Sequence, residues 1–279
     1  MTLSIIIVNY KNLELLKLCL KSIQEHLSGE NLDYETLVVD SEAQLETEPV
    51  LLENFPGIRY FPFQKNIGYA GGVNCGIKNS SGKYLLILNP DIIITAGAIP
   101  KMLAHLKQNP EIGMLGPRLL GFNGKIQNSR FSFYRPSTII YRRTFLGKSF
   151  FGRKELSRFN LDNNQPTEPI YPDWIMGSAI LTSRQAVEKV GPMDERFFLY
   201  FEDVDWAWRF WENGFKVQYF PEATMLHYHQ RSSRVGFDFF DFFLRREARW
   251  HISSALKYFF KHGWKYRSGK ELFKAKFNV

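Results

Sequence analysis

The pattern of hydrophobic and polar positions predicts alternating strands and helices over the first hundred residues. Residues 3–8 form a continuous apolar run, which is typical of a strand buried on both faces of a parallel sheet. Leucine and isoleucine then recur every three or four positions over 13–27, which predicts an amphipathic helix. Further strands are expected at 34–39, 58–63 and 84–88, with helices over 71–79 and up to Asn109-Pro110. This order predicts an α/β fold with a mostly parallel sheet.

The pattern weakens between residues 113 and 177, where proline, asparagine, glycine and arginine are scattered among aromatic residues. We interpret this stretch as an irregular or hairpin-like insertion. Ordered structure is expected again at 174–182, followed by a helix over 184–190 that Gly191-Pro192 ends.

Composition and charge narrow the classes of protein to consider. With 279 residues and 44% hydrophobic content the chain is globular, and its net charge of +8 suits nucleic acid, an anionic membrane or a phosphorylated substrate. Residues 130–160 hold eight basic residues and one acid, and residues 237–279 hold ten basic residues and four acids. The rest of the chain is acidic in balance, which argues against a surface that wraps nucleic acid throughout.

Cysteine usage and the lack of a long apolar span indicate the compartment. Cys19 and Cys75 are too few for a disulfide scaffold, so a reducing compartment is expected. The first residues have neither the basic region nor the cleavage site of a signal peptide. The most apolar span, residues 84–100, is interrupted by Asn89-Pro90-Asp91. We expect a cytoplasmic protein, soluble or peripherally attached to a membrane.

Polar residues follow the predicted strands, at the edge of a parallel sheet where chemistry usually collects. They are Asn9, Asp40, Asn66 and Asp91. One aspartate after a strand is commonly a turn former or a helix N-cap. Two of them, Asp40 and Asp91, point weakly to a nucleotide and a metal.

Residues 65–76 form a glycine-dense loop that enters a helix. Such a loop lets backbone N–H groups and a helix N-terminus approach a phosphate. It is neither a P-loop nor a GxGxxG fingerprint. A tight turn with close helix packing is the more ordinary explanation of the glycines, and both interpretations stay open.

Three carboxylates within four residues, Glu202, Asp203 and Asp205, lie among aromatic residues. Acids in apolar surroundings hold protons more tightly, which suits a general base, whereas the alternative is a solvated first turn of a helix. His227 and His229 lie two apart on a predicted strand and could ligate a metal, although a core histidine is the ordinary explanation for one of them.

Taken in order, these residues resemble the family 2 glycosyltransferases of the GT-A fold, and within them bacterial rhamnosyltransferase-like enzymes. The matching pieces lie at residues 4–10, 37–40, 66–77, 85–91, 174–209 and 227–233. The resemblance implies a three-layer α/β/α fold with a mostly parallel central sheet and a C-terminal helical tail rich in basic and aromatic residues. It divides the chain into a glycosyltransferase domain at 1–236, with a nucleotide-sugar half at 1–112 and an acceptor and catalytic half at 113–236, and the tail at 237–279.

The resemblance also implies the roles of single residues. A nucleotide-sugar donor would contact Asn9, Tyr10, Asp40, Asn66, Gly68, Gly72, Asn74 and Asn89. Asp91 and His227 would hold Mg²⁺ or Mn²⁺ on the donor diphosphate, with His229 as the alternative histidine. Asp203 would be the catalytic base, beside Glu202. Trp174 and Gly177 would line the acceptor side, although packing alone would explain both residues.

Each of these roles has a chemical reason. Transfer with inversion needs a base that takes the proton from the acceptor hydroxyl, and a divalent cation stabilises the charge of the leaving nucleoside diphosphate. Two departures from the family pattern concern the donor. The metal motif reads Asn89-Pro90-Asp91, with an amide in place of one carboxylate, and Ser41-Glu42-Ala43 follows Asp40 where many relatives carry an asparagine and a serine.

The sequence therefore predicts an inverting transfer of L-rhamnose from dTDP-rhamnose to a glycan or a polyprenyl-diphosphate-linked acceptor in bacterial surface polysaccharide synthesis. A UDP-linked hexose is the alternative donor. A nucleotidyltransferase would carry a glycine-rich basic loop after its first strand, where this chain has Asn9-Tyr10-Lys11-Asn12. A non-catalytic nucleic-acid- or membrane-binding module leaves the acid cluster unexplained. We expect no nucleic acid partner, and the oligomeric state stays open.

The last 43 residues contain thirteen aromatic side chains. One helical face would carry Leu244, Ala248, His251, Ala255, Tyr258 and Phe259, with Arg245, Arg249 and Lys257 elsewhere. This composition suits the anionic inner face of the cell membrane, and the alternative is a helix that packs on the catalytic domain. The basic segment 130–158 is expected to contact the acceptor diphosphate.

Overall fold

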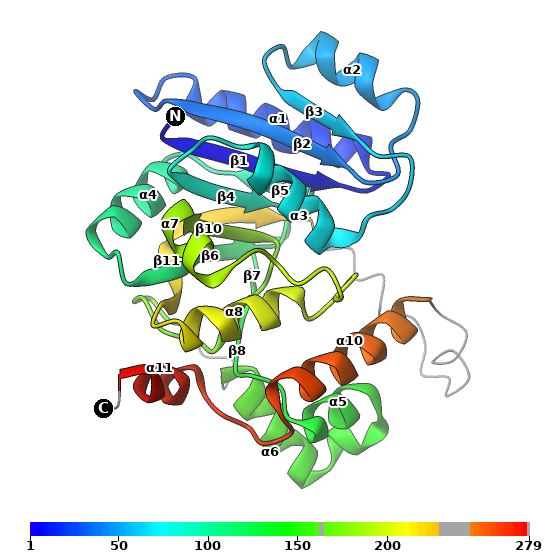
Figure 1. Ribbon diagram of the computed structural model, residues 1–279, viewed down its shortest axis with the longest axis vertical. Helices are drawn as coiled ribbons and strands as arrows, with labels where there is room; N and C mark the ends of the chain where they lie inside the picture. Colours follow the sequence, from blue (N-terminus) through cyan, green and yellow to red (C-terminus); the bar gives the residue numbers. More distant parts are fainter. Residues whose placement is uncertain (162–164, 229–245, 278–279) are drawn as a thin grey trace.

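The computed structural model describes residues 1–161, 165–228 and 246–277, and a twisted nine-stranded sheet forms its centre (Figure 1). The strand order along the sheet is β3 (Arg59–Pro62), β2 (Tyr34–Asp40), β1 (Leu3–Asn9), β4 (Tyr84–Leu88), β10 (Ala179–Ser183), β6 (Ile112–Leu120), β11 (Lys216–His227) and β5 (Ile92–Ile94), with β7 (Ile126–Gln127) on β6. The first four strands of this order are parallel, and β10 runs antiparallel to both β4 and β6.

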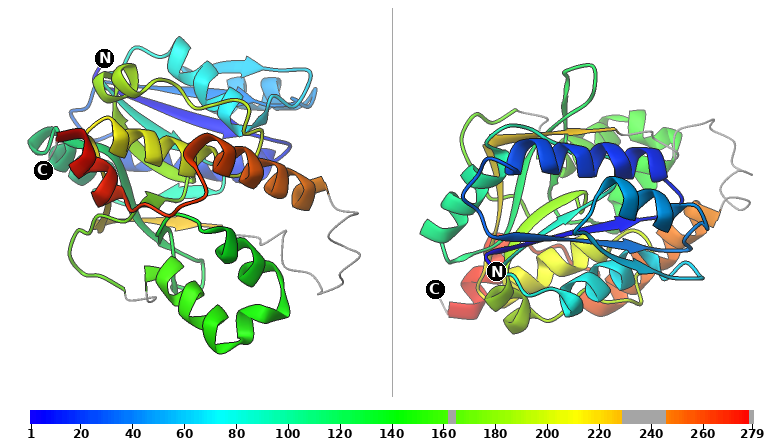
Figure 2. Two further views of the ribbon diagram at one scale, coloured as in Figure 1. Left: turned by 60° about the horizontal axis from the view of Figure 1, so that its bottom comes forward. Right: turned by 90° about the horizontal axis from the view of Figure 1, so that it is seen from above.

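Helices cover both faces of the sheet (Figure 2, right). One face is covered by α1 (Leu13–Leu27), α2 (Thr47–Asn54) and α4 (Ala98–Gln108), and the other by α3 (Gly68–Asn79), α7 (Arg184–Val190), α8 (Glu202–Glu212), α10 (Arg246–His262) and α11 (Gly269–Phe277). Along β1, Ile5 and Ile7 pack in the core beneath α1, whereas Ile6 and Val8 pack in the core on the opposite face, beneath α3. Burial on both faces is why this strand is continuously apolar, and the expected three-layer α/β/α architecture is confirmed.

Helix α3 lies directly on β1 because its glycines leave room for the strand. A Cβ atom at Gly72 would meet Val8 at 2.5 Å, and one at Gly76 would meet Ile6 at 2.2 Å. Gly68 begins the helix with φ of +75°, a conformation that a residue with a side chain rarely adopts. Close packing therefore accounts for much of the glycine density in the 65–76 loop.

The stretch between 113 and 177, which we expected to be an irregular or hairpin-like insertion, is regular over most of its length, and it includes an antiparallel hairpin of β6 and β7. Strand β6 crosses the main sheet, and a small sheet of β8 (Arg130–Phe131) and β9 (Trp174–Ile175) follows. Between them stands a helical hairpin made of α5 (Pro136–Arg143), the 3₁₀ turn η1 (Phe145–Lys148) and α6 (Phe150–Phe159). Gly113 and Gly116 interrupt the strand pattern in the sequence. Both glycines are needed, because a Cβ atom at Gly113 would lie 2.4 Å from Phe210 and one at Gly116 would lie 2.7 Å from Ile175.

The C-terminal helices belong to the same hydrophobic core as α8. Ala255, Tyr258 and Phe259 of α10 and Leu272 of α11 are buried in the same cluster as α8. The face that we considered for a membrane therefore packs on the domain, as far as it is described. Leu244, Arg245, the side chain of Ala248 and the proposed boundary at 236 lie outside the described residues.

Candidate active site

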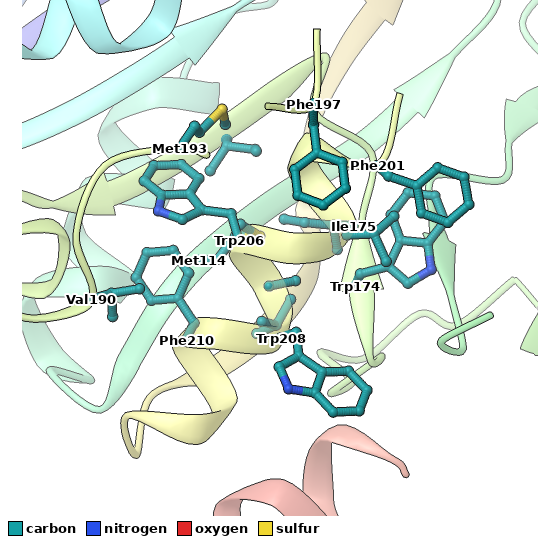
Figure 3. Close-up of a cluster of buried hydrophobic side chains, with 14 of the residues drawn as sticks. Met114, Trp174, Ile175, Val190, Met193, Phe197, Phe201, Trp206, Trp208 and Phe210 are labelled. Carbon is teal, nitrogen blue, oxygen red and sulfur yellow. The ribbon is translucent and has the colours of Figure 1, made fainter. Parts of the chain in front are cut away.

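The acid cluster begins at a strained point of the backbone. Tyr200 and Phe201 both have left-handed φ angles, +68° and +71°, immediately before α8 starts at Glu202. Each such residue costs about 1–3 kcal/mol, so the surrounding structure must hold it in place. The Phe201 ring is buried and lies 4.6 Å from the ring of Tyr134, and it packs beside α8 in the aromatic cluster of Figure 3. The turn therefore fixes the first residues of α8 against the interior.

The Asp203 carboxylate is held in place by two backbone N–H groups. Its Oδ2 accepts a hydrogen bond from the Gly177 N–H at 2.9 Å, and its Oδ1 accepts one from the Val204 N–H at 2.9 Å. Burial raises the pKa of Asp203 to about 6, although these N–H groups oppose the rise. The carboxylate is thus ionised at neutral pH and still basic enough to take a proton.

Glu202 differs from its neighbour in its surroundings. Its side chain is buried, and in the described ranges its Oε2 has no hydrogen-bond partner. Burial, together with the charge of Asp203, raises the pKa of Glu202 well above its ordinary value.

Asp205, the third acid of the cluster, is structural. Its Oδ2 accepts from Arg209 Nε at 2.9 Å, and its Oδ1 lies 2.7 Å from His262 Nε2 and 2.6 Å from Lys261 Nζ. Burial would raise the pKa of Asp205, but the hydrogen bond from His262 and the charge of Arg209 outweigh it and lower the pKa. Asp205 therefore joins α10 to α8 by ion pairs. The cluster as a whole lies against the interior, so the alternative of a solvated helix start does not apply.

Tyr69 was missed by sequence reasoning and connects the parts of the site. Its hydroxyl donates to the Gly177 carbonyl, and its pKa is raised well above the ordinary value by burial and by the charges of Glu202, Asp203 and Asp91. The ring therefore lies close to Glu202, to Asp203 and to the predicted metal ligand Asp91. The only signal in the sequence was an aromatic residue inside the glycine-dense loop.

Asp91 and His227 meet where β5 and β11 run side by side. His227 Nε2 lies 3.4 Å from Asp91 Oδ2, and Asp91 Oδ1 is buried with no hydrogen-bond partner in the described part of the chain. His227 Nδ1 lies 2.7 Å from Oε1 of Gln127, whose Nε2 donates to the His227 carbonyl. The amide orientation makes Nδ1 the donor, so Nε2 is the nitrogen that faces Asp91.

These two residues fit a divalent cation. A carboxylate oxygen with unused capacity and an imidazole oriented by a second partner are suitable ligands. Within residues 1–161, 165–228 and 246–277, no group of three or more histidine, cysteine or acidic residues forms a metal site. Substrate phosphates and water commonly complete such a coordination shell. His229, the alternative ligand, lies outside the described residues.

The predicted nucleoside contacts form a hydrogen-bonded network at the ends of β1 and β2. Asp40 is buried, with one oxygen accepting from Asn9 Nδ2 at 2.8 Å and the other from the Tyr60 hydroxyl at 2.8 Å. Burial raises the pKa of Asp40 although both hydrogen bonds oppose it. Ser41 and Asn66 then hold the start of the glycine-dense loop, since the N–H of Ile67 donates to Ser41 and that of Gly68 to Asn66. Tyr60 and Ser41 were not predicted.

Three other predicted residues serve packing in this structure. The Asn74 amide bonds to both the N–H and the carbonyl of Met193, which joins α3 to the segment before α8. Gly72 makes room for Val8. Trp174 is buried in the aromatic cluster with its indole N–H donating to the Ser132 carbonyl (Figure 3). Contacts of these three with a substrate stay predictions.

The remaining predicted residues lie around the site. Tyr10 is half exposed just after β1. The Asn89 N–H donates to the Ser178 carbonyl at 2.9 Å, next to Gly177, so the loop that carries Asp91 is tied to the peptide that orients Asp203. The structure thus brings Asp91, His227, Tyr69, Gly177, Glu202 and Asp203 together, with the Asn9 and Asp40 network further along the same sheet edge.

The class of protein follows from this fold and site together with a sequence match. Residues 4–170 match glycosyl transferase family 2, and the chain belongs to this family. Two curated relatives are similar to it. One is the N-acetylglucosaminyl-diphospho-decaprenol L-rhamnosyltransferase of Mycobacterium tuberculosis, 28% identical over 71% of this chain and 67% of that protein. The other is the rhamnosyltransferase WbbL of Escherichia coli, 25% identical over 86% of this chain and 87% of that protein.

Solved structures share the fold. GalNAc-T7 with UDP, GalNAc and Mn²⁺ aligns over 82% of this chain and 44% of its own, with a TM-score of 0.61 and 14% identity. TarS of S. aureus aligns over 82% of this chain and 37% of its own, with a TM-score of 0.57 and 14% identity. The chain thus spans less than half of each of these proteins. The family match favours the glycosyltransferase among the three classes that the sequence left open.

Proposed function

We propose that the chain is an inverting glycosyltransferase that moves L-rhamnose from dTDP-rhamnose to a polyprenyl-diphosphate-linked or glycan acceptor in bacterial surface polysaccharide synthesis. The observation that carries the catalytic part is the Asp203 carboxylate, which two backbone N–H groups orient and which burial brings to a pKa of about 6. The two similar rhamnosyltransferases support the sugar, and the printed name of one supports a lipid-linked acceptor.

Asp203 takes the proton from the acceptor hydroxyl as that oxygen attacks the anomeric carbon on the side opposite the leaving nucleoside diphosphate. Gly177 and Val204 keep the carboxylate in one orientation, so little reorganisation precedes proton transfer. Burial and the charge of Asp203 raise the pKa of Glu202 beside it well above its ordinary value.

Asp91 and His227 are the residues that would hold Mg²⁺ or Mn²⁺. When bound, the cation stabilises the negative charge of the leaving diphosphate. Gln127 fixes the His227 ring so that Nε2 faces Asp91, and the Asn89 backbone ties this loop to Ser178. Asn9, Tyr10, Asp40 and Asn66 lie at the sheet edge where the nucleoside would bind, with Asp40 oriented by Tyr60.

A lipid-linked acceptor places the enzyme at the inner face of the cell membrane. No helix among the described residues is long and apolar enough to span a bilayer. The proposal is therefore peripheral attachment, with the basic segment 130–158 near the acceptor diphosphate. Arg142 donates to the Tyr134 hydroxyl, and the charge of Asp203 acts on the same tyrosine, which puts this arginine on the catalytic side of the molecule.

The test is donor binding followed by transfer. Calorimetric titration with dTDP-rhamnose and a UDP-hexose, with and without Mg²⁺ or Mn²⁺, is expected to show cation-dependent binding of dTDP-rhamnose that Asp91→Ala loses. Asp203→Asn should bind donor normally and transfer about a hundredfold to ten-thousandfold more slowly. Glu25→Gln, an exposed carboxylate on α1, is the matched control.

Three outcomes would count against parts of the proposal. Tighter binding of the UDP-hexose would replace the donor by the alternative one. An Asp203→Asn rate within tenfold of the unchanged protein would remove Asp203 as base. Steeply salt-dependent binding of oligonucleotides, with no nucleotide-sugar affinity, would favour the non-catalytic binding module.

A further inference from the structure

The helical hairpin of α5, η1 and α6 ends in a cluster of apolar side chains that point to solvent. The hairpin projects from the body of the molecule (Figure 2, left). Phe145, Phe150 and Phe151 are 75%, 70% and 72% exposed, and Ile140 and Leu146 are also exposed. Large apolar side chains gathered at one surface mark an interaction site rather than scattered exposure. We name these five residues the apolar tip.

The apolar tip is rigidly built. A Cβ atom at Gly147 would meet the Tyr141 carbonyl oxygen at 2.2 Å, and one at Gly152 would meet the Leu146 carbonyl oxygen at 2.2 Å, so the turn packs closely on both helices. The Ser149 hydroxyl caps α6 by accepting from the Gly152 N–H at 3.1 Å. Phe150 and Phe151 thus lie on the first turn of a capped helix, where their exposure is a feature of the fold.

Within the hairpin, residues 136–160, the exposed charges are all positive. Arg142, Lys148, Arg153 and Lys154 are exposed. The one acid between residues 136 and 160, Glu155, is buried and forms ion pairs with Arg135 at 3.1 Å and Arg158 at 2.6 Å. A hairpin with exposed aromatic, aliphatic and basic side chains, and with no exposed acid of its own, matches the headgroup region of an anionic bilayer.

Arg142 also connects the hairpin to the catalytic side of the molecule. Arg142 donates to the hydroxyl of Tyr134, whose ring lies 4.6 Å from that of Phe201, next to Glu202. The positive charges of Arg143 and Arg142 also act on buried His251, whose pKa is lowered to about 3 by burial first and by these charges second. One hairpin therefore carries an apolar tip at its end and an arginine pair near the acid site.

We propose that the apolar tip is the membrane-docking surface of this protein and inserts into an anionic lipid bilayer, which brings Arg142 and Arg143 to the headgroup level. The proposal rests on the proposed function only for the identity of the acceptor. It assigns the membrane contact to the hairpin instead of the C-terminal tail, because Ala255, Tyr258 and Phe259, on the α10 face that we considered for the membrane, are buried in the domain. A protein partner or a second copy of this chain is the competing occupant.

The first experiment compares matched exposed phenylalanines. Phe150→Ser with Phe151→Ser is expected to lower partitioning onto phosphatidylcholine vesicles that contain phosphatidylglycerol by about tenfold. Phe260→Ser, which removes a ring that is 76% exposed on α10, should change it less than about twofold. Replacing Lys148, Arg153 and Lys154 by glutamate should cost about a hundredfold on anionic vesicles. Thermal melting of each variant should match the unchanged protein because all these side chains are exposed.

The second experiment reports insertion directly. A tryptophan placed by Phe150→Trp should be quenched by lipids brominated in their acyl chains, whereas Phe260→Trp should give no quenching beyond that of the unchanged protein. Quenching at 260 but not at 150, or full vesicle binding by the double serine variant, would overturn the assignment. Concentration-dependent dimerisation that the double serine variant abolishes, without vesicle binding, would assign the tip to a second copy.

Vesicle binding can be measured without glycosyl transfer, so the docking proposal and the proposed function can be refuted independently of each other. The double serine variant should keep its donor affinity and its transfer to a water-soluble acceptor analogue, and should lose transfer to an acceptor embedded in vesicles. Vesicle binding through the tip without any transfer would leave the docking surface intact and count against the proposed reaction.

Discussion

The backbone N–H of Gly177 donates to Oδ2 of Asp203 at 2.9 Å, and a side chain at position 177 would crowd Asp203. A Cβ atom at position 177 would lie 3.3 Å from Asp203 Cβ and 3.5 Å from Tyr69 Cε1. The carbonyl of the same glycine accepts from Tyr69. A single peptide thus sets the position of the base and of the ring beside it.

Gly177→Ala should therefore lower turnover without affecting donor binding. The added methyl group displaces the Asp203 carboxylate by a few tenths of an ångström, and misplaced catalytic groups lose rate steeply. We expect kcat to fall about tenfold while the calorimetric Kd for the donor stays the same. Gly29→Ala, where nothing lies within 4 Å of the new Cβ, is the control. Weaker donor binding with unchanged kcat would show that Gly177 serves the donor instead.

The pH profile should report Asp203. Because burial raises its pKa to about 6, the base is lost as pH falls through that value, and kcat/KM should drop about tenfold per pH unit below it. Burial and the charge of Asp203 raise the pKa of Glu202 well above its ordinary value, and Glu202→Gln, which keeps the size of this side chain, should keep both the profile and kcat within a few fold. Rates that stay level down to pH 5 would exclude Asp203 as the titrating base.

Gln127 should control cation affinity through His227. Gln127→Leu removes the partner that fixes the imidazole, and such partners change metal affinity by about tenfold to a hundredfold. Titration of Mn²⁺ in the presence of dTDP, followed by electron paramagnetic resonance, measures this without turnover. Gln24→Leu on the exposed side of α1 is the control. An unchanged Mn²⁺ affinity would show that His227 has no part in a cation site.

The elements that the sequence predicted well are those whose burial produces a regular pattern of apolar residues along the chain. Strand β1 and helix α1 match the expected ranges because the strand is apolar on both faces and the helix on one. Strand β6 left no such trace because it needs glycine where other side chains press against it. The helical hairpin was missed because its exposed phenylalanines break the pattern of an amphipathic helix.

The residues of the candidate site likewise fall into those that the sequence could identify and those that only the fold reveals. Asp91, Asp203 and His227 could be singled out because they stand beside strands or in an acid cluster and match a family pattern. Gln127 and Tyr69 could not, since their partners lie 100 and 108 residues away along the chain. Only the fold brings such pairs together, and the same is true of Tyr60 and Asp40 on neighbouring strands.

Asp205 should matter for stability where Asp203 matters for rate. Asp205→Asn leaves Arg209 and Lys261 without their buried partner and should lower the free energy of unfolding by about 3 kcal/mol in urea titrations at pH 7. The folded-state pKa of Asp205 is lowered, so its contribution is present above the ordinary pKa and lost as pH falls below it. The difference from the unchanged protein should therefore shrink towards pH 3. A constant difference at all pH values would point to packing instead of charge.

Phe259 and Phe260 are neighbours on α10 with opposite surroundings, and they test whether the C-terminal helices belong to the domain core. Phe259 is 3% exposed and packs with Tyr258 and Trp264, whereas Phe260 is 76% exposed. Phe259→Ala should cost about 3–5 kcal/mol of unfolding free energy, because it leaves a cavity beside α8, and Phe260→Ala should stay within about 0.5 kcal/mol. Urea titrations followed by circular dichroism measure both. Equal, small effects would mean that α10 detaches from the domain in solution. The C-terminal tail would then again be a candidate for the membrane contact.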